Sequence, residues 1–418
     1  MKKSTLRNII SIMAAVVLAL CTAGWAAAES LPGSEPCYSA DDLFTDRDLE
    51  QSADLSGAET LTVSDGNDIH ITRAGVYVLA GTASGATVYV EADSDDKVQL
   101  VLDGLNITNA DFPCIYILSA DKVFVTVAAD SSLSVTGSFR KDGNTKTDGV
   151  IFSKQDLVLN GTASLVVSST DNGIVCKDDL KVTGGTWTVT ASSKAIEAND
   201  SIRIAGGTFV LAAGTDAIHA ENDDDDTKGF VYIGSGTFTL KASDDGIHAT
   251  SVIQVDGGTV SITAKEGLEA TVIQINGGTV NITSTDDGIN AARKSSAYTP
   301  AVIFNGGEVN ITMGQGDTDG IDSNGNIYMN GGIVSVNGNS TFDYDGVAEY
   351  NGGTIYLNGQ ASATIPNQLM GGGGGRGQQG GFGQPGEWGQ QGGRGQQGGW
   401  GPNGGQDNGG WGGRGGRR

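Results

Sequence analysis

A glycine turn recurs at a nearly fixed interval through the middle of the chain. The second glycines of these Gly-Gly or Gly-x-Gly turns are Gly185, Gly207, Gly236, Gly258, Gly278, Gly307, Gly332 and Gly353. The shorter intervals are 20 to 22 residues, and the longer ones contain inserted loops. Between the turns, apolar and polar residues alternate and β-branched residues are frequent, which favours strands over helices. A period of this length repeated over eight units predicts a solenoid.

Three apolar columns run through these repeats. The first contains Ile174, Ile196, Ile218, Ile247, Leu268 and Ile289, and the second, two residues further on, contains Cys176, Ala198, Ala220, Ala249, Ala270 and Ala291. The third contains Trp187, Phe209, Phe238, Val260, Val280, Val309, Val334 and Ile355. Residues two apart on a strand share a face, so these columns predict the core. We therefore interpret Cys176 as a small core residue and Trp187 as a core aromatic.

The fold that fits these columns is all-β, a right-handed parallel β-helix whose coils stack at the ~4.8 Å spacing of neighbouring strands. Residues 76–365 are expected to form about a dozen coils, and residues 29–75 an N-terminal cap. A left-handed helix of hexapeptides and a calcium-binding nonapeptide roll do not fit, because neither period is present.

The two ends of the chain differ from the solenoid. Residues 1–28 combine a basic start, an apolar run and a small-residue cleavage site, which predicts a signal peptide and a secreted or cell-surface protein. Cys21 leaves lipid anchoring open as an alternative. Residues 366–418 are rich in Gly, Gln, Trp and Arg and predict a disordered tail. No other apolar run approaches the ~18 residues that a membrane span needs.

The formal charge of −24 argues against nucleic acids or anionic membranes as partners and favours cations. Cys37, Cys114 and Cys176 would remain after signal cleavage, an odd number without the spacing of a disulfide framework or a cysteine zinc site. We expect a monomer.

Acidic residues precede or follow the first apolar column in consecutive repeats. Neighbouring carboxylates one strand apart repel by ~3.5 kcal/mol at an effective dielectric of ~20. Solvation, raised pKa values or a bound cation would each relieve this repulsion, and Ca²⁺ prefers six to eight such oxygen ligands. The glycine after each acidic pair is expected to adopt a positive φ. The sequence predicts Ca²⁺ sites between coils, built from Asp244, Asp245, Glu266, Glu269, Asp286, Asp287, Asp319 and Asp322. A solvated acidic edge is the alternative.

Several other residues are candidates for glycan chemistry. Tyr328 and Tyr356 are out of phase with the core and are candidates for stacking on sugars. Lys265 is the candidate base for a lyase reaction, although its acidic neighbours favour the charged form and weaken it as a base. His219 and His248 share an outward position one coil apart, where we expect surface histidines.

Several motifs occurring in order resemble a bacterial secreted family. They are TDRDLEQS, GVYVLAG, KVQLVLDGLNITN, CIYILSADKVFVTV and the repeated DDGI and NGGT turns, between about residues 40 and 365. The family is that of carbohydrate-binding domain-containing proteins with a polysaccharide-lyase-like parallel β-helix. The resemblance implies calcium at the acidic turns and affinity for cellulose or polygalacturonate, without established catalysis.

Three functions remain open from the sequence. The first is a non-catalytic polysaccharide-binding protein that uses Ca²⁺. The second is a calcium-dependent, pectate-lyase-like enzyme, for which no convergent acid, base and clamp is visible. The third is a structural surface adhesin whose tail makes the contacts.

Overall fold

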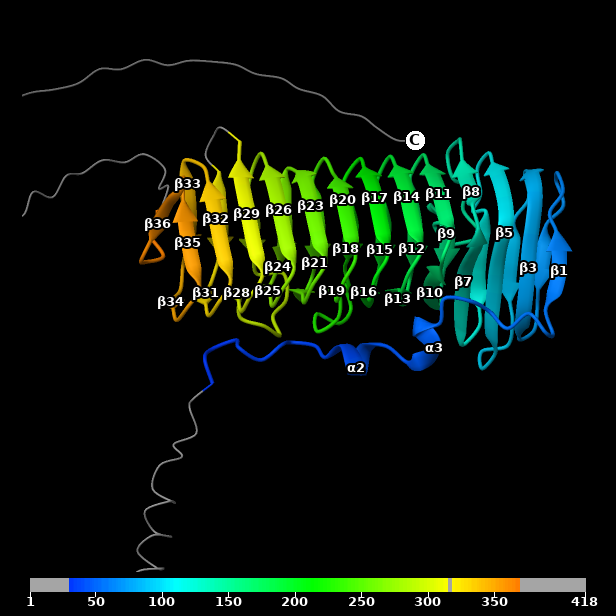
Figure 1. Ribbon diagram of the computed structural model, residues 1–418. Coiled ribbons are helices and arrows are strands. Elements are labelled where there is room, and N and C mark those ends of the chain that lie inside the picture. The colour runs from blue at the N-terminus through cyan, green and yellow to red at the C-terminus, as the bar shows by residue number, and fades with distance from the viewer. Residues whose placement is uncertain (1–29, 315–317, 369–418) are drawn as a thin grey trace, which may run out of the picture. The chain divides into compact units, whose positions relative to one another are not determined.

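A computed structural model describes residues 30–314 and 318–368 of the chain. These residues form strands almost throughout, with two helices of four residues each, α2 (Ala40–Leu43) and α3 (Asp46–Leu49). Successive coils stack along one axis (Figure 1). The predicted all-β parallel β-helix is confirmed, whereas the expected signal peptide and almost all of the expected tail lie outside the described residues.

Each coil of the regular part contributes three strands to three parallel ladders. The first ladder is a separate 12-stranded sheet, in agreement with about a dozen coils. Its strands are β2 (Ile69–Ile71), β4 (Val88–Glu91), β6 (Ile115–Ser119), β9 (Gly149–Ser153), β12 (Asn172–Cys176), β15 (Ile196–Ala198), β18 (Ile218–Ala220), β21 (Asp245–Ala249), β24 (Glu266–Ala270), β27 (Ile289–Ala291), β30 (Asp319–Ser323) and β33 (Ser340–Tyr344).

The other two ladders belong to one 24-stranded sheet. The second ladder comprises β7 (Lys122–Ala129), β10 (Asp156–Gly161), β13 (Asp179–Val182), β16 (Ser201–Ile204), β19 (Phe230–Ile233), β22 (Val252–Val255), β25 (Val272–Ile275), β28 (Ala301–Phe304), β31 (Asn326–Met329) and β34 (Ala348–Tyr350). The third comprises β8 (Ser131–Val135), β11 (Ser164–Ser169), β14 (Thr186–Ala191), β17 (Thr208–Ala213), β20 (Thr237–Lys241), β23 (Thr259–Ala264), β26 (Thr279–Ser284), β29 (Glu308–Met313), β32 (Ile333–Asn337) and β35 (Thr354–Leu357).

The first coils include two strands that are longer than those of the regular coils. β1 (Glu59–Thr62), β3 (Gly75–Ser84) and β5 (Lys97–Asn109) pair in parallel, and β5 then pairs with both β7 and β8. At the other end, β36 (Gln360–Ser362) pairs with β35 antiparallel, in contrast to the parallel pairing along the ladders.

The three apolar columns predicted from the sequence form the interior. Ile174, Ile196 and Ile218 are register partners and are fully buried. Trp187 is only 1% exposed in the third column, and Cys176 is fully buried in the second. These core assignments are confirmed.

The glycine turns let the coils stack closely. Gly258 has a φ of +86°, a conformation that L side chains rarely adopt. A Cβ at this position would also lie 2.6 Å from the carbonyl oxygen of Gly236 in the preceding coil. The turn therefore requires glycine for two independent reasons.

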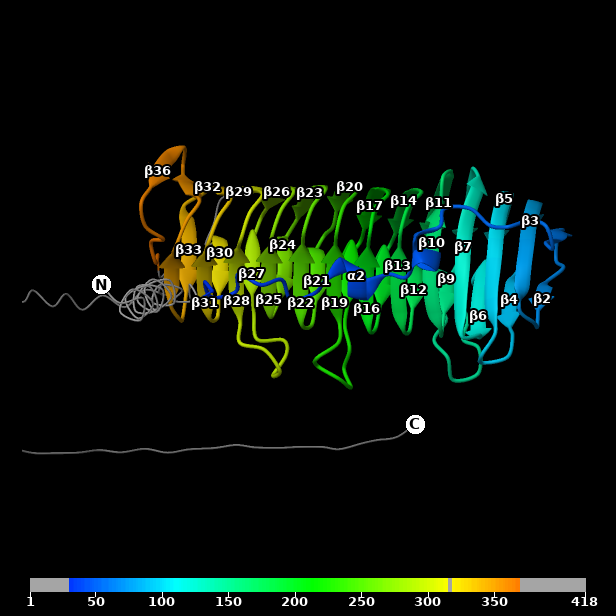
Figure 2. The same cartoon turned by 60° about the horizontal axis from the view of Figure 1, so that its bottom comes forward.

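The N-terminal segment, residues 30–51, lies lengthwise along the outside of the second ladder (Figures 1 and 2). The side chains of Gln254 and Gln274 bond to its backbone at Tyr38 and Cys37, and Lys181 pairs with the fully buried Asp48 at 2.7 Å. Of the expected cap at residues 29–75, residues 30–51 thus form a strap along the side, and β1 and β2 already belong to the coils.

The described residues contain no helix long and apolar enough to cross a membrane.

Candidate functional site

One side chain per strand of the first ladder points outward, between the inward aliphatic residue and the inward small residue. We call this series the outward column. From the N-terminal coil onward it reads His70, Tyr89, Tyr116, Phe152, Val175, Glu197, His219, His248, Glu269, Asn290, Asp322 and Asp343. Its first four members are aromatic, and nearly all members after Val175 are charged or ionisable. The ladder therefore presents two chemically different ends.

A second row of carboxylates lies beside the charged end, two residues before each inward aliphatic side chain. This acidic row consists of Asp216, Asp245, Glu266, Asp287 and Asp319. Contacts link it to the outward column: Asn290 donates to Glu266, and the Asp245 carboxylate lies 2.8 Å from His248. Both rows therefore share the outer face of the ladder.

A glycine follows four of these five acidic residues, the exception being Asp216, which is followed by Ala217. A Cβ at Gly246 would lie 2.3 Å from Cγ2 of Ile262, and a Cβ at Gly267 would lie 2.2 Å from the oxygen of Gly288. Neither Gly246 nor Gly267 has a positive φ, so the expectation of a left-handed turn here is wrong. The glycines are required because the position faces the packed interior, where no side chain fits.

The middle of the acidic row has its own positive charges. Lys265 lies 3.5, 3.3 and 3.4 Å from the carboxylates of Asp244, Glu266 and Asp286. Partial burial alone would lower the pKa of Lys265, but the charges of Glu266 and Asp244 outweigh it and raise that pKa. Lys265 is thus held in its charged form, where it serves as a countercharge and is a poor base.

Glu269 is also neutralised. Its carboxylate lies 2.8 Å from Lys294 and 2.9 Å from His248. Burial would raise the pKa of Glu269, but His248 and Lys294 lower it well below its usual range. Of the eight predicted calcium ligands, Asp244, Asp245, Glu266, Glu269 and Asp286 therefore have positive side chains of the protein itself beside them.

At the C-terminal end of the acidic row and the outward column, carboxyl groups have raised pKa values. Burial raises the pKa of Asp287 to about 7, and Asp322 adds repulsion. Burial likewise raises the pKa of Asp322 to about 6, with repulsion from Asp343 and Asp319. Within residues 30–314 and 318–368, no basic side chain forms an ion pair with Asp287, Asp322 or Asp343. Partly buried carboxylates beside like charges are oxygen ligands of the hard kind that Ca²⁺ prefers.

The two predicted tyrosines lie apart from this face and from each other. Tyr328 is on β31 of the second ladder, half-buried in a cluster that includes Tyr38, Tyr298 and Ile303. Tyr356 is on β35 of the third ladder, where it is 38% exposed. The structure does not bring them together.

The histidines are outward, as the repeat predicts, but the expectation that they lie at the surface is wrong. His219 and His248 are only 6% and 7% exposed, with their rings stacked. Carboxylates on both sides and the neighbouring coils cover them.

The aromatic end of the outward column is not among the features predicted from the sequence. His70 stacks on Tyr89 with ring centroids 4.7 Å apart, and Tyr116 packs edge-on between Tyr89 and Phe152. The available signal was the central residue of the short strands VYV, IYI and IFS, which alternates with the apolar columns. Tyr116 and Phe152 are buried, whereas Tyr89 is half-buried and His70 is exposed.

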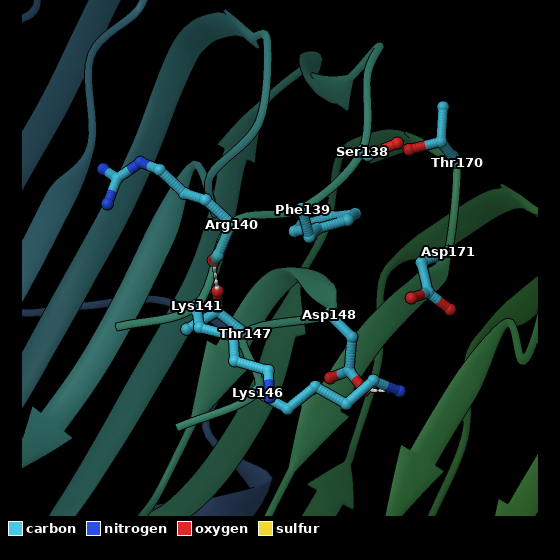
Figure 3. A pocket seen from close by; sticks show the side chains of 9 residues that line it. All are labelled: Ser138, Phe139, Arg140, Lys141, Lys146, Thr147, Asp148, Thr170 and Asp171. Atoms are coloured by element: carbon cyan, nitrogen blue, oxygen red, sulfur yellow. Dashed lines mark hydrogen bonds and ion pairs between the residues drawn. The ribbon is translucent and has the colours of Figure 1, made fainter. Parts of the chain in front are cut away.

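A cavity of about 420 Å³ lies next to this aromatic end (Figure 3). Residues 138–141 and 146–148, in the loop between β8 and β9, form one wall, and Thr170 and Asp171 form the other. Lys146 Nζ lies 2.8 Å from Asp148 Oδ2, while the Arg140 guanidinium points away from these acids and covers the ring of Phe112 at 3.8 Å. The cavity thus offers polar groups of both signs.

The chain is similar to a known protein family and to two individual proteins. A family model described as carbohydrate-binding domain-containing protein matches residues 65–318. A carbohydrate-binding domain-containing protein of Acetivibrio thermocellus is 33% identical over 154 residues, which are 36% of this chain and 52% of the relative. The chain therefore matches about half the length of that relative. The gadolinium derivative of a polysaccharide lyase-like protein from C. thermocellum is 24% identical with a TM-score of 0.40, and the match covers 71% of this chain and 96% of that one.

Proposed function

The chain belongs to the family of carbohydrate-binding domain-containing proteins, and on this premise we propose that it is a non-catalytic polysaccharide-binding protein. In this proposal it holds Ca²⁺ at the C-terminal end of the acidic row and the outward column. The polymers it binds are plant cell-wall glycans, polygalacturonate or cellulose. We further propose that it acts outside the cell, either secreted or at the surface, and as a monomer.

The observation that supports the calcium site is a group of carboxylates that form no ion pair with any basic side chain in the described part of the chain. Asp287 and Asp322 are partly buried, face other acids and have raised pKa values. Asp343 continues the outward column beside Asp322. Together these residues would supply oxygen ligands from neighbouring coils to one ion.

The regular spacing of the ladder suits a linear polymer. Outward side chains recur at the ~4.8 Å spacing of strands, so a polysaccharide with its own short repeat can meet equivalent groups over several coils. Ca²⁺ bound at the acidic end would supply the positive charge that a uronate carboxylate needs on an acidic surface. Tyr89 and His70 at the other end offer partly exposed ring faces for a sugar.

The surroundings of Lys265 argue against the lyase alternative. A base that removes a proton must be neutral near the working pH, whereas three carboxylates within 3.5 Å keep Lys265 charged. The adhesin alternative depends on the tail, which lies outside the described residues.

Binding to immobilised polygalacturonate and to cellulose, with and without EDTA, tests the proposal. We expect retention on at least one polymer, and loss of polygalacturonate retention in EDTA. Asp322→Asn should weaken the calcium-dependent retention, while Asp103→Asn, at an exposed position of β5, should not. Equal retention of the wild-type protein in calcium and in EDTA would contradict the calcium site, and no retention on either polymer would contradict the function.

A further inference from the structure

Two histidines on neighbouring coils occupy equivalent places in the outward column. His219 of β18 and His248 of β21 are register partners, and their ring centroids lie 4.5 Å apart with an interplanar angle of 16°. Both residues are more than nine-tenths buried. Buried ring nitrogens need polar partners, because an unpaired one costs free energy.

Both rings have a carboxylate on the same nitrogen. Asp216 Oδ2 lies 2.9 Å from His219 Nδ1, and Asp245 Oδ2 lies 2.8 Å from His248 Nδ1, in each case from the residue three positions earlier. Glu269 adds a second carboxylate oxygen 2.9 Å from His248 Nδ1. The Asp245 carboxylate accepts the hydrogen of His248 Nδ1, so Nε2 is the nitrogen of that ring left for a metal ion, which would displace any hydrogen there. In His219 the hydrogen bond is made by Nε2, to Glu221, and an ion bound between these two groups would replace it.

A third possible ligand lies on the Nε2 side of the stack. Glu221 Oε2 is 3.1 Å from His219 Nε2. One ligand atom each from His219, Glu221 and His248 lies within 4.8 Å of the other two. The Nε2 atom of His248 is buried and has no hydrogen-bond partner among the described residues. A buried ring nitrogen without a hydrogen-bond partner, next to a second imidazole and a carboxylate, is the environment of a metal ligand.

The group is open to solvent on one side. His219 and Glu221 line a cavity of about 250 Å³, together with Asn222 and Glu197. The side chain of Glu221 is 49% exposed. An ion therefore has a route of entry, and a water molecule has space to complete its coordination.

We propose that His219 Nε2, His248 Nε2 and the Glu221 carboxylate bind a divalent transition-metal ion of the Zn²⁺ class, with a water as the fourth ligand. Two imidazoles and one carboxylate are a common ligand set for zinc with an open position. Asp245 fixes the tautomer and orientation of the His248 ring, the role that carboxylates play behind metal-bound histidines, and Asp216 lies beside Nδ1 of His219.

This site differs in chemistry from the proposed calcium site. Imidazole nitrogen suits Zn²⁺, Cu²⁺ or Ni²⁺, whereas Ca²⁺ takes oxygen ligands. Zn–N bonds of about 2.0–2.1 Å are shorter than half the present ring spacing, so binding should tilt the Nε2 edges of the two rings toward the ion. The proposal does not depend on glycan binding.

Calorimetric titration of the EDTA-stripped full chain with Zn²⁺ alone tests the site. We expect one Zn²⁺ to bind per chain at this position in the presence of excess Ca²⁺. His219→Gln and His248→Gln should each abolish that binding, and Asp245→Asn should weaken it about 10- to 100-fold by removing a positioning carboxylate. With Co²⁺ in place of Zn²⁺, visible absorption of a low-coordinate, nitrogen-ligated ion should appear in the wild-type protein and disappear in both histidine variants.

The chain provides its own control. His70 is the third histidine, occupies the same column and pairs with Glu91, but lies outside the cluster. His70→Gln should leave the affinity for Zn²⁺ unchanged. Because the buried histidine variants could disturb folding, Glu221→Gln at a half-exposed position is the decisive variant, and it should lose at least about tenfold in affinity. The proposal is overturned if the wild-type protein binds no Zn²⁺, if Glu221→Gln binds it as tightly as the wild type, or if Ca²⁺ displaces it.

Discussion

Replacing Asp287 by Asn should stabilise the protein when calcium is removed. Asp287 is a partly buried carboxyl whose pKa is raised to about 7 by burial and by Asp322. Carboxylates on adjacent strands, about 5 Å apart, repel by ~3 kcal/mol at an effective dielectric of ~20. Solvent screening of these partly exposed groups reduces the net cost to ~1 kcal/mol. That gain corresponds to a rise in Tm of about 2 °C for a domain of this size.

The sign of the pH dependence follows from the direction of the shift. A carboxyl whose pKa is raised in the folded state holds its proton more tightly there than in the unfolded chain. The stability of the calcium-free protein should therefore fall as the pH rises from about 4 toward the folded pKa of about 7. Asn does not titrate, so the variant should show a shallower fall.

Thermal unfolding in EDTA, followed by circular dichroism across this pH range, measures both effects. Asp103→Asn is the matched control, because it removes one exposed carboxylate outside the acidic row. In saturating Ca²⁺ the order should reverse, since the wild-type protein keeps a ligand that the variant has lost. A variant that is less stable than the wild type in EDTA above pH 7, or that keeps the full wild-type slope, would refute the reasoning.

Three further predictions concern the solenoid and its strap. Trp187→Ala removes an indole that is 1% exposed and should lower the free energy of unfolding by ~3–5 kcal/mol, measured by denaturant unfolding; a loss below ~1 kcal/mol would contradict its core position. Gly246→Ala places a methyl 2.3 Å from Ile262 and should lower the free energy of unfolding by ~1–3 kcal/mol. In the control Gly104→Ala no atom lies within 4 Å of the added Cβ, so this variant should lose only the free energy that the strain of its positive φ costs. Lys181→Met removes the 2.7 Å partner of the fully buried Asp48, which keeps Lys122 at 3.6 Å, and should cost ~1–3 kcal/mol in strap docking, seen as faster proteolysis within residues 30–51. Unchanged cleavage would show that the strap does not depend on this pair.

The sequence by itself determined the coils, because each coil repeats the same local pattern. Ile247 and Ala249 are inward and His248 outward for the same reason as Ile218, Ala220 and His219: strand residues alternate between faces, and the turn resets the phase every coil. The carboxylates gather at one corner for the same reason, because they occupy equivalent positions in successive repeats.

Which of those carboxylates lack a countercharge was decided only by the tertiary structure. Lys294 reaches Glu269 from the loop that follows β27, and Lys265 touches acids of its own and of both neighbouring coils. Whether a side chain from a loop falls on a given carboxylate depends on loop conformation, which the repeat does not specify.

The repeat likewise does not determine which outward side chains are buried. Tyr328 is out of phase with the core, yet it is half-buried in a cluster shared with Tyr38 of the strap. Gln254 binds the strap at Tyr38 across 216 residues of sequence. Period and alternation determine which way a side chain points, but what covers it depends on contacts between segments far apart in the chain, and those form only when the whole solenoid has been assembled.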